Sequence, residues 1–172
     1  MSMIFKLRML SNEDENFLRD YEVPYDIKLD DLHYFMAEDL GYNKESLASF
    51  FLSNKNWEKI QEFTLIDMGI EDKTEDGPAP MSSRVIGQLL HKNNDRLLYL
   101  FDPFMDRAMY IELIGAEKLN EQFDYPRTLL ANGSPPDQFN PDLSPDNKSI
   151  FEEVMDDFYD FEGDELYDED LY

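Results

Sequence analysis

The chain has 172 residues, of which 42% are hydrophobic and 14% aromatic, and its 39 acidic and 15 basic side chains give a formal net charge of −24. This length and apolar content suit one domain with its own core and exclude disorder over the whole chain. Direct nucleic-acid binding usually needs a patch of basic residues, and this strongly acidic chain does not favour one. The absence of cysteine excludes disulfides, cysteine-ligated metal sites and thiol catalysis.

The first forty residues predict a β-hairpin followed by a helix. Apolar residues alternate from Met3 to Met9, which is the period of a half-buried strand, and the alternation resumes after a polar turn from Phe17 to Pro24. From Leu29 to Leu40 the apolar spacing becomes that of a helix. Gly41 is placed for the left-handed residue that ends such a helix.

The next segment predicts strands separated by a long acidic loop. Residues Leu47 to Leu52 form a dense apolar run that is typical of a buried strand, and Ile60 to Ile66 predict a further strand or turn. Acids, a glycine and two prolines between Glu71 and Pro80 predict an exposed loop. Ser82 and Ser83 are then expected to cap a short helix that runs to Leu90.

A second hairpin is expected in the middle of the sheet. Its strands are Arg96–Asp102, which is almost entirely apolar, and Arg107–Ile114, with a short link between them. Beyond Glu117 the repeated prolines predict a surface loop. We therefore expect an α+β body, a single domain with a mixed β-sheet, hairpins, and helices packed on one face.

The last residues form an acidic tail with interleaved aromatic side chains. Eleven acidic residues and no basic residue follow Lys148, so we divide the chain into a body, 1–148, and a tail, 149–172. Three interpretations of the tail stay open. The first is a solvated appendage. The second is a segment whose charge steers a partner into contact and whose aromatic rings anchor that partner. The third is a terminal helix that covers the protein's own sheet.

Two carboxylates at the tip of the second hairpin are the main candidates for chemistry. Asp102 and Asp106, with Arg107 beside them, suit either a divalent cation or a turn that begins with Asp-Pro. The turn is favoured, because no group poised as a base accompanies the pair. We assign no catalytic, cofactor-binding or metal-binding residue.

Three further features favour plain structural roles. His33 lies on the core-facing side of the predicted helix and is expected to be a structural histidine, while His91 ends the predicted short helix. Residues 72–77 resemble the start of a calcium-binding loop, but the twelfth position is Ser83 where a glutamate is needed. Arg127 either binds an anionic ligand or pairs with a carboxylate of its own loop.

Several short motifs lie between about Met3 and Phe139. They are Asp31-Leu32-His33, Gly41-Tyr42, Leu47 to Phe50, Tyr99-Leu100-Phe101-Asp102, Tyr125-Pro126-Arg127 and Gly133-Ser134-Pro135-Pro136-Asp137. Together these motifs resemble the plasmid pRiA4b open-reading-frame-three-like family, whose members occur on plasmids and beside insertion elements. Ser134 stands where the family has cysteine, and Pro103–Arg107 replaces its Gly-Asp-x-Trp segment. The resemblance implies an α+β fold and supplies no activity.

The leading hypothesis is a non-enzymatic protein-interaction module whose acidic, aromatic tail engages a basic protein surface. The alternatives are a hydrolase or nuclease-like enzyme that uses Asp102 and Asp106 with a divalent ion, and a small-ligand-binding module. No cofactor, direct nucleic-acid partner or membrane partner is expected, and a cytoplasmic bacterial protein is the default. The candidate interaction residues are Arg127, Phe158, Tyr159, Phe161 and Tyr167.

Overall fold

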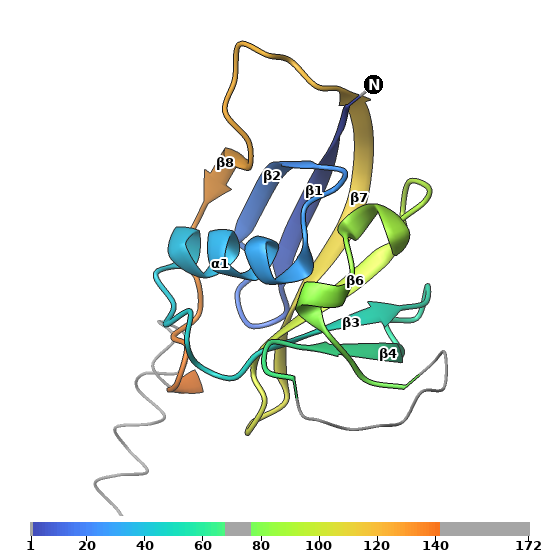
Figure 1. The fold of residues 1–172 in the computed structure, drawn as a ribbon. Helices are drawn as coiled ribbons and strands as arrows, with labels where there is room; N and C mark the ends of the chain where they lie inside the picture. The colour runs from blue at the N-terminus through green and yellow to red at the C-terminus, as the bar shows by residue number, and fades with distance from the viewer. Residues whose placement is uncertain (1, 68–76, 142–172) are drawn as a thin grey trace, which may run out of the picture. The chain divides into compact units, whose positions relative to one another are not determined.

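The computed structural model describes residues 2–67 and 77–141, which form one eight-stranded sheet with one α-helix (Figure 1). Along the sheet the strands follow the order β5 (Ala79–Pro80), β4 (Lys59–Thr64), β3 (Ser49–Ser53), β6 (Arg96–Asp102), β7 (Arg107–Lys118), β1 (Met3–Ser11), β2 (Leu18–Pro24) and β8 (Arg127–Asn132). Neighbouring strands are antiparallel except β4 and β5, which are parallel. The described fold is mostly β and fits the predicted α+β class loosely.

The helix α1 (Leu29–Leu40) supplies the covering layer of the core. Its buried side chains include Leu32 and Met36, each fully shielded from solvent, and burial of a side chain of this size contributes roughly 1.5–3 kcal/mol. Gly41 ends the helix with φ of 71°, and its N–H donates to the Glu38 carbonyl. The predicted helix and its glycine terminus are therefore confirmed.

Apolar side chains alternate along the strands, so that they gather on the face of the sheet that α1 covers. Leu7 and Met9 of β1, Tyr99 of β6 and Ile111 of β7 all belong to this core, as the two-residue period requires. The central strand β6 is buried on both faces, since six of its seven residues are buried. The sheet order confirms that β6 and β7 form the central hairpin.

The predicted short helix after Pro80 is wrong. The chain instead forms two 3₁₀ turns, η1 (Met81–Ser83) and η2 (Ile86–Gln88), with extended backbone between them. That backbone bonds to the start of α1, since the Leu29 N–H donates to the Arg84 carbonyl, and Val85 forms a β-bridge with Lys28 just before the helix. Ser83 Oγ donates to the Pro80 carbonyl rather than capping a helix. Pairing with a distant segment therefore overrides the local helical spacing.

Part of the surface loop predicted beyond Glu117 is the edge strand β8, which pairs with β2. Most of its residues are exposed, so it lacks the alternation in burial that identifies a strand from sequence. The strand β7 also extends beyond Ile114 to Lys118, because its end pairs with the start of β1. Within the loop predicted for residues 71–80, the described end forms β5.

The predicted tail lies outside the described residues. The predicted boundary at Lys148 and the four tail candidates Phe158, Tyr159, Phe161 and Tyr167 fall there. The chain divides into two compact units after Pro135. In the described part of the second unit, Asp137 Oδ1 accepts hydrogen bonds from the N–H groups of Phe139 and Asn140.

Across residues 2–67 and 77–141, no helix has both the length and the apolar character needed to cross a membrane.

Candidate functional site

A row of alternating charges crosses the sheet face opposite α1. Arg8 of β1 donates from Nε and Nη2 to the two carboxylate oxygens of Asp20 on β2, both at 2.9 Å. Glu112 of β7 lies opposite Arg8 on the other side and accepts a 3.0 Å hydrogen bond from Arg96 of β6. This bonding follows from the register, because residues directly opposite on neighbouring strands share one face.

In the described part of the chain, seven of the thirteen basic side chains form ion pairs. Eight ion pairs occur there, with carboxylates from the same unit as partners. Much of the body's positive charge is therefore already neutralised. The seven cations engaged are Lys6, Arg8, Arg19, Lys59, Arg96, Arg107 and Arg127.

Each of the two hairpin-tip carboxylates is bonded to a different cation. Arg107 Nη1 donates to Asp102 at 3.2 Å, and Arg107 Nη2 donates to Glu13 at 2.8 Å. Lys59 donates to Asp106 at 2.6 Å. Within the residues that are described, no group of three or more histidines and acids is arranged to hold a metal ion. The geometry at this tip is that of ion-paired turn residues.

The hairpin tip also carries apolar side chains into solvent. Phe104 is 89% exposed and Met105 is 61% exposed. The backbone turns tightly here, with Asp106 at φ of 52°. Single exposed apolar residues are ordinary on a protein surface, so this tip by itself assigns no partner.

Three of the sequence motifs meet in the core between α1 and β6, namely Asp31-Leu32-His33, Gly41-Tyr42 and Tyr99-Leu100-Phe101-Asp102. His33 is 1% exposed, and its Nε2 donates to the Lys44 carbonyl at 2.8 Å. Because a carbonyl can only accept, the other ring nitrogen, Nδ1, accepts the hydroxyl proton of Tyr99 at 2.8 Å. The ring of Tyr42 also packs on Phe101, with centroids 5.1 Å apart. These motif residues hold α1 against the sheet, which is the structural role expected for His33.

Burial lowers the pKa of the His33 imidazole below its usual value of 6.5. The unfolded chain therefore binds a proton at this position at a higher pH than the native protein does, so His33 stabilises the fold above pH 6.5 and this contribution is lost as the pH falls.

We expect the stability difference between the wild type and a His33→Gln variant to shrink as the pH is lowered from 7 to 5.5. Urea denaturation of both proteins at several pH values measures this change. A difference that stays constant with pH would contradict it.

Arg127 contacts groups of its own unit. Its Nε donates to Glu22 of β2 at 2.9 Å, and its guanidinium lies 3.8 Å from the centre of the Phe123 ring. The peptide bond between Tyr125 and Pro126 is cis. Arg127 thus joins the loop before β8 to β2, and its role as a ligand contact stays a prediction.

A polar cluster that sequence reasoning missed lies between α1, β2 and β8. Asp39 accepts hydrogen bonds from the hydroxyls of Tyr21 at 2.7 Å and Thr128 at 2.8 Å. Arg19 Nε lies 3.3 Å from Asp39 and is buried without a hydrogen bond. Arg19 Nη1 donates to the carbonyls of Asn132 and Gly133. The cluster fixes the edge strand, and no local motif marks it in the sequence.

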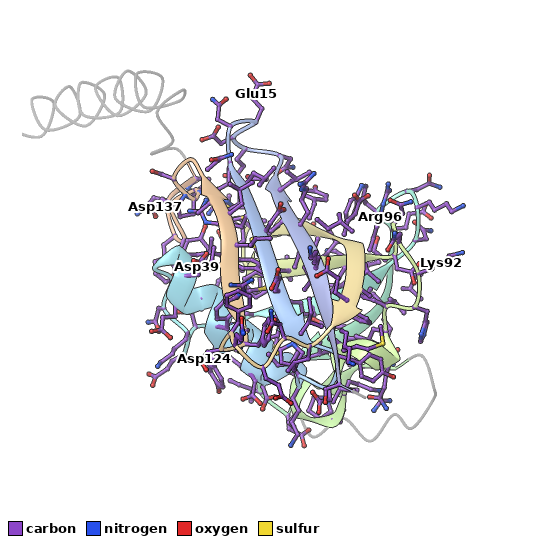
Figure 2. All side chains as sticks on the ribbon, turned by 90° about the horizontal axis from the view of Figure 1, so that it is seen from above. Glu15, Asp39, Lys92, Arg96, Asp124 and Asp137 are labelled. Carbon is purple, nitrogen blue, oxygen red and sulfur yellow. The ribbon has the colours of Figure 1, made fainter. Side chains whose placement is uncertain are left out.

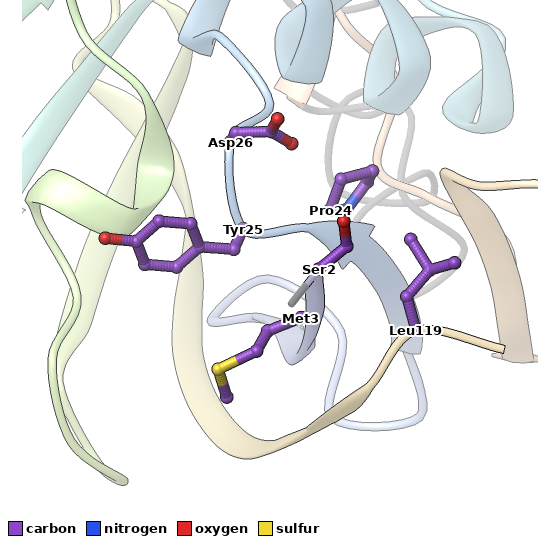
Figure 3. Close-up of a pocket in the computed structure, with 6 residues that line it drawn as sticks. All are labelled: Ser2, Met3, Pro24, Tyr25, Asp26 and Leu119. Atoms are coloured by element: carbon purple, nitrogen blue, oxygen red, sulfur yellow. The ribbon is translucent and has the colours of Figure 1, made fainter.

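A hollow of about 750 Å³ opens at the ends of β1, β2 and β7. Figure 3 shows Met3, Tyr25 and Leu119 around it, with Asp26 nearby. The Tyr25 ring lies close to Gly87, where a Cβ atom would be 2.2 Å from Tyr25 Cε2, so a larger residue at position 87 would displace this ring. The hollow offers apolar walls with one carboxylate, which is space for a small ligand without any assembled catalytic group.

The sequence pattern of the plasmid pRiA4b ORF-3-like protein family matches residues 3–140. The chain belongs to this family. The structure of MM3350, a protein of unknown function from Methanosarcina mazei Go1, is similar in fold, with a TM-score of 0.61 and 13% identity over 76% of this chain and 70% of that one. No curated protein matches the chain. The family resemblance read from the motifs is therefore confirmed.

Proposed function

We propose that this pRiA4b ORF-3-like protein is a non-enzymatic interaction module whose tail, residues 149–172, binds a basic surface on another protein. The supporting observation is the internal pairing of the body's cations. Seven of the thirteen basic side chains of the described residues are already held by carboxylates, so the six others are too few to neutralise the eleven acids after Lys148. A cationic partner lowers the repulsion among these acids.

The tail has two kinds of group that suit such a partner. Its carboxylates would steer a basic surface into contact, which mainly raises the association rate. Its rings, at Phe158, Tyr159, Phe161 and Tyr167, would supply the buried anchors that carry most binding energy in protein interfaces. A cytoplasmic location, and the association with bacterial mobile elements that the family resemblance implies, belong to the same proposal.

Binding of the full chain to an immobilised peptide of lysine, arginine and leucine tests the proposal at two salt concentrations. Replacing the four tail rings with serine, with every carboxylate kept, is expected to weaken binding at least about tenfold and to leave its salt dependence unchanged. Replacing six tail acids with their amides is expected to slow association and to flatten the salt dependence.

A Phe104→Ser variant is the matched control, because it removes an exposed ring from the body and leaves the tail intact. It is expected to bind as the wild type does. Equal affinity of the wild type, the ring variant and the amide variant would remove the tail from the interaction.

A further inference from the structure

We propose that a pocket on the body binds a small phosphate-bearing anion. The pocket has a volume of about 370 Å³ and is lined by residues 53–55, in the turn after β3, and residues 92–96, in the turn that leads into β6. Lys55, Lys92 and Arg96 all contribute to its wall. This grouping of bases is unusual in a chain with only 15 basic residues and a net charge of −24.

The two lysines are the groups available to a ligand. Neither Lys55 nor Lys92 takes part in any of the ion pairs formed among the described residues. Figure 2 shows Lys92 and Arg96 at the right of the view, away from Asp39 and Asp124 at its left. A lysine ammonium binds phosphate as a point charge, and two of them on one pocket wall form a suitable receptor.

Arg96 holds the two turns in place. Its Nε donates to Glu112 at 3.0 Å and its Nη1 donates to the Lys55 carbonyl. Its guanidinium lies 4.6 Å from the centre of the Trp57 ring, on which it stacks. Because Arg96 belongs to the central strand β6, these contacts tie the turn after β3 to the rigid part of the sheet.

The second turn is ordered by its own acidic residue. Asp95 Oδ2 accepts hydrogen bonds from the N–H groups of His91 at 2.8 Å and Lys92 at 3.1 Å. The Asn94 N–H donates to the Leu113 carbonyl of β7, with Asn94 at φ of 76°. The one carboxylate in the pocket wall is therefore engaged by backbone donors, which lessens its repulsion of an incoming anion.

Size and charge together select the ligand class. The pocket lies near the lower end of the roughly 300–1,000 Å³ range of ligand pockets, so it suits phosphate itself or a small phosphomonoester. A long polyanion would meet the net negative charge of the rest of the molecule, which disfavours a nucleic-acid backbone. Recognition of the phosphate group is shared by both small ligands.

Trp57, the one tryptophan in the chain, reports on this pocket through its stacking on Arg96. We expect a saturable change in its fluorescence when the full chain is titrated with sodium phosphate or glycerol 3-phosphate, with ionic strength kept constant by sodium chloride. Amide NMR shifts of residues 93–96 in the same titrations provide a second readout. Tighter binding of glycerol 3-phosphate would assign a phosphomonoester, and equal binding would assign free phosphate.

Charge-matched variants make the assignment specific. Lys55→Gln and Lys92→Gln are each expected to weaken binding by about tenfold. Lys118→Gln removes the same charge from an exposed lysine at the end of β7, outside the pocket wall, and is expected to change the affinity less than about twofold. The absence of a saturable response in both readouts, or equal weakening by all three substitutions, would overturn the proposal.

Discussion

Replacement of Arg107 with alanine is expected to lower the free energy of unfolding by about 3–5 kcal/mol, the usual cost of leaving one member of a buried ion pair without its partner. The side chains of Arg107 and Asp102 are each 8% exposed. Arg107 also bonds to Glu13 of the β1–β2 turn and stacks on the Phe101 ring, 4.8 Å from its centre. Its loss would leave the Asp102 carboxylate buried and unpaired.

Urea denaturation measures this effect, and a neighbouring ion pair provides the control. Lys59→Ala removes the partner of Asp106 at the same hairpin tip, where the two side chains are 40% and 72% exposed, and is expected to cost less than about 1 kcal/mol. Adding Asp102→Asn to Arg107→Ala should recover part of the lost stability, since it removes the unpaired charge. Similar losses for Arg107→Ala and Lys59→Ala would contradict the assignment of a buried pair.

Replacement of Tyr99 with phenylalanine is expected to cost about 1–3 kcal/mol, because it leaves the buried Nδ1 of His33 without a donor. The Tyr99 side chain is 1% exposed, so water cannot substitute for the lost hydroxyl without a rearrangement of the core. The ring itself is retained, including its contact with Phe50, whose centroid lies 5.0 Å away. The loss therefore isolates the hydrogen bond.

Tyr110→Phe is the matched control for this measurement. Its hydroxyl accepts a 3.3 Å hydrogen bond from Asn12 at a partly exposed site, so the substitution is expected to change stability by less than about 0.5 kcal/mol. Thermal or urea unfolding of both variants provides the comparison. Equal stability of Tyr99→Phe and Tyr110→Phe would show that the contact between His33 and Tyr99 does not stabilise the fold.

The contrast between His33 and β8 shows what local sequence can predict here. The helical spacing around His33 places it on the core side, and the structure agrees. Its partner Tyr99 lies 66 residues away, and spacing along one element carries no information on such a pair. The strand β8 was missed because its side chains are mostly exposed, so its identity depends on backbone bonds to β2.

The candidate sites also differ in how far the local sequence reveals them. Asp102 and Asp106 are candidates because they are near neighbours in the sequence, yet in the structure each bonds to a different basic side chain. The bases that line the pocket, Lys55, Lys92 and Arg96, come from two turns and look unremarkable in the sequence. Only the pairing of β3 with β6, in which Ser53 lies opposite Arg96, brings these turns together at one end of the two strands.

Local periodicity is enough to predict the first hairpin, α1 and the central hairpin, and the residues after Lys148 alone show the acidic charge of the tail. Periodicity is sufficient there because burying one face of a strand or helix requires a local repeat of apolar side chains. Four features follow only from the folded chain: the strand order, the edge strand β8, the replacement of a helix by η1 and η2, and the partner of each buried polar group. These depend on contacts between distant segments, whose free energy outweighs the small local propensities of the chain.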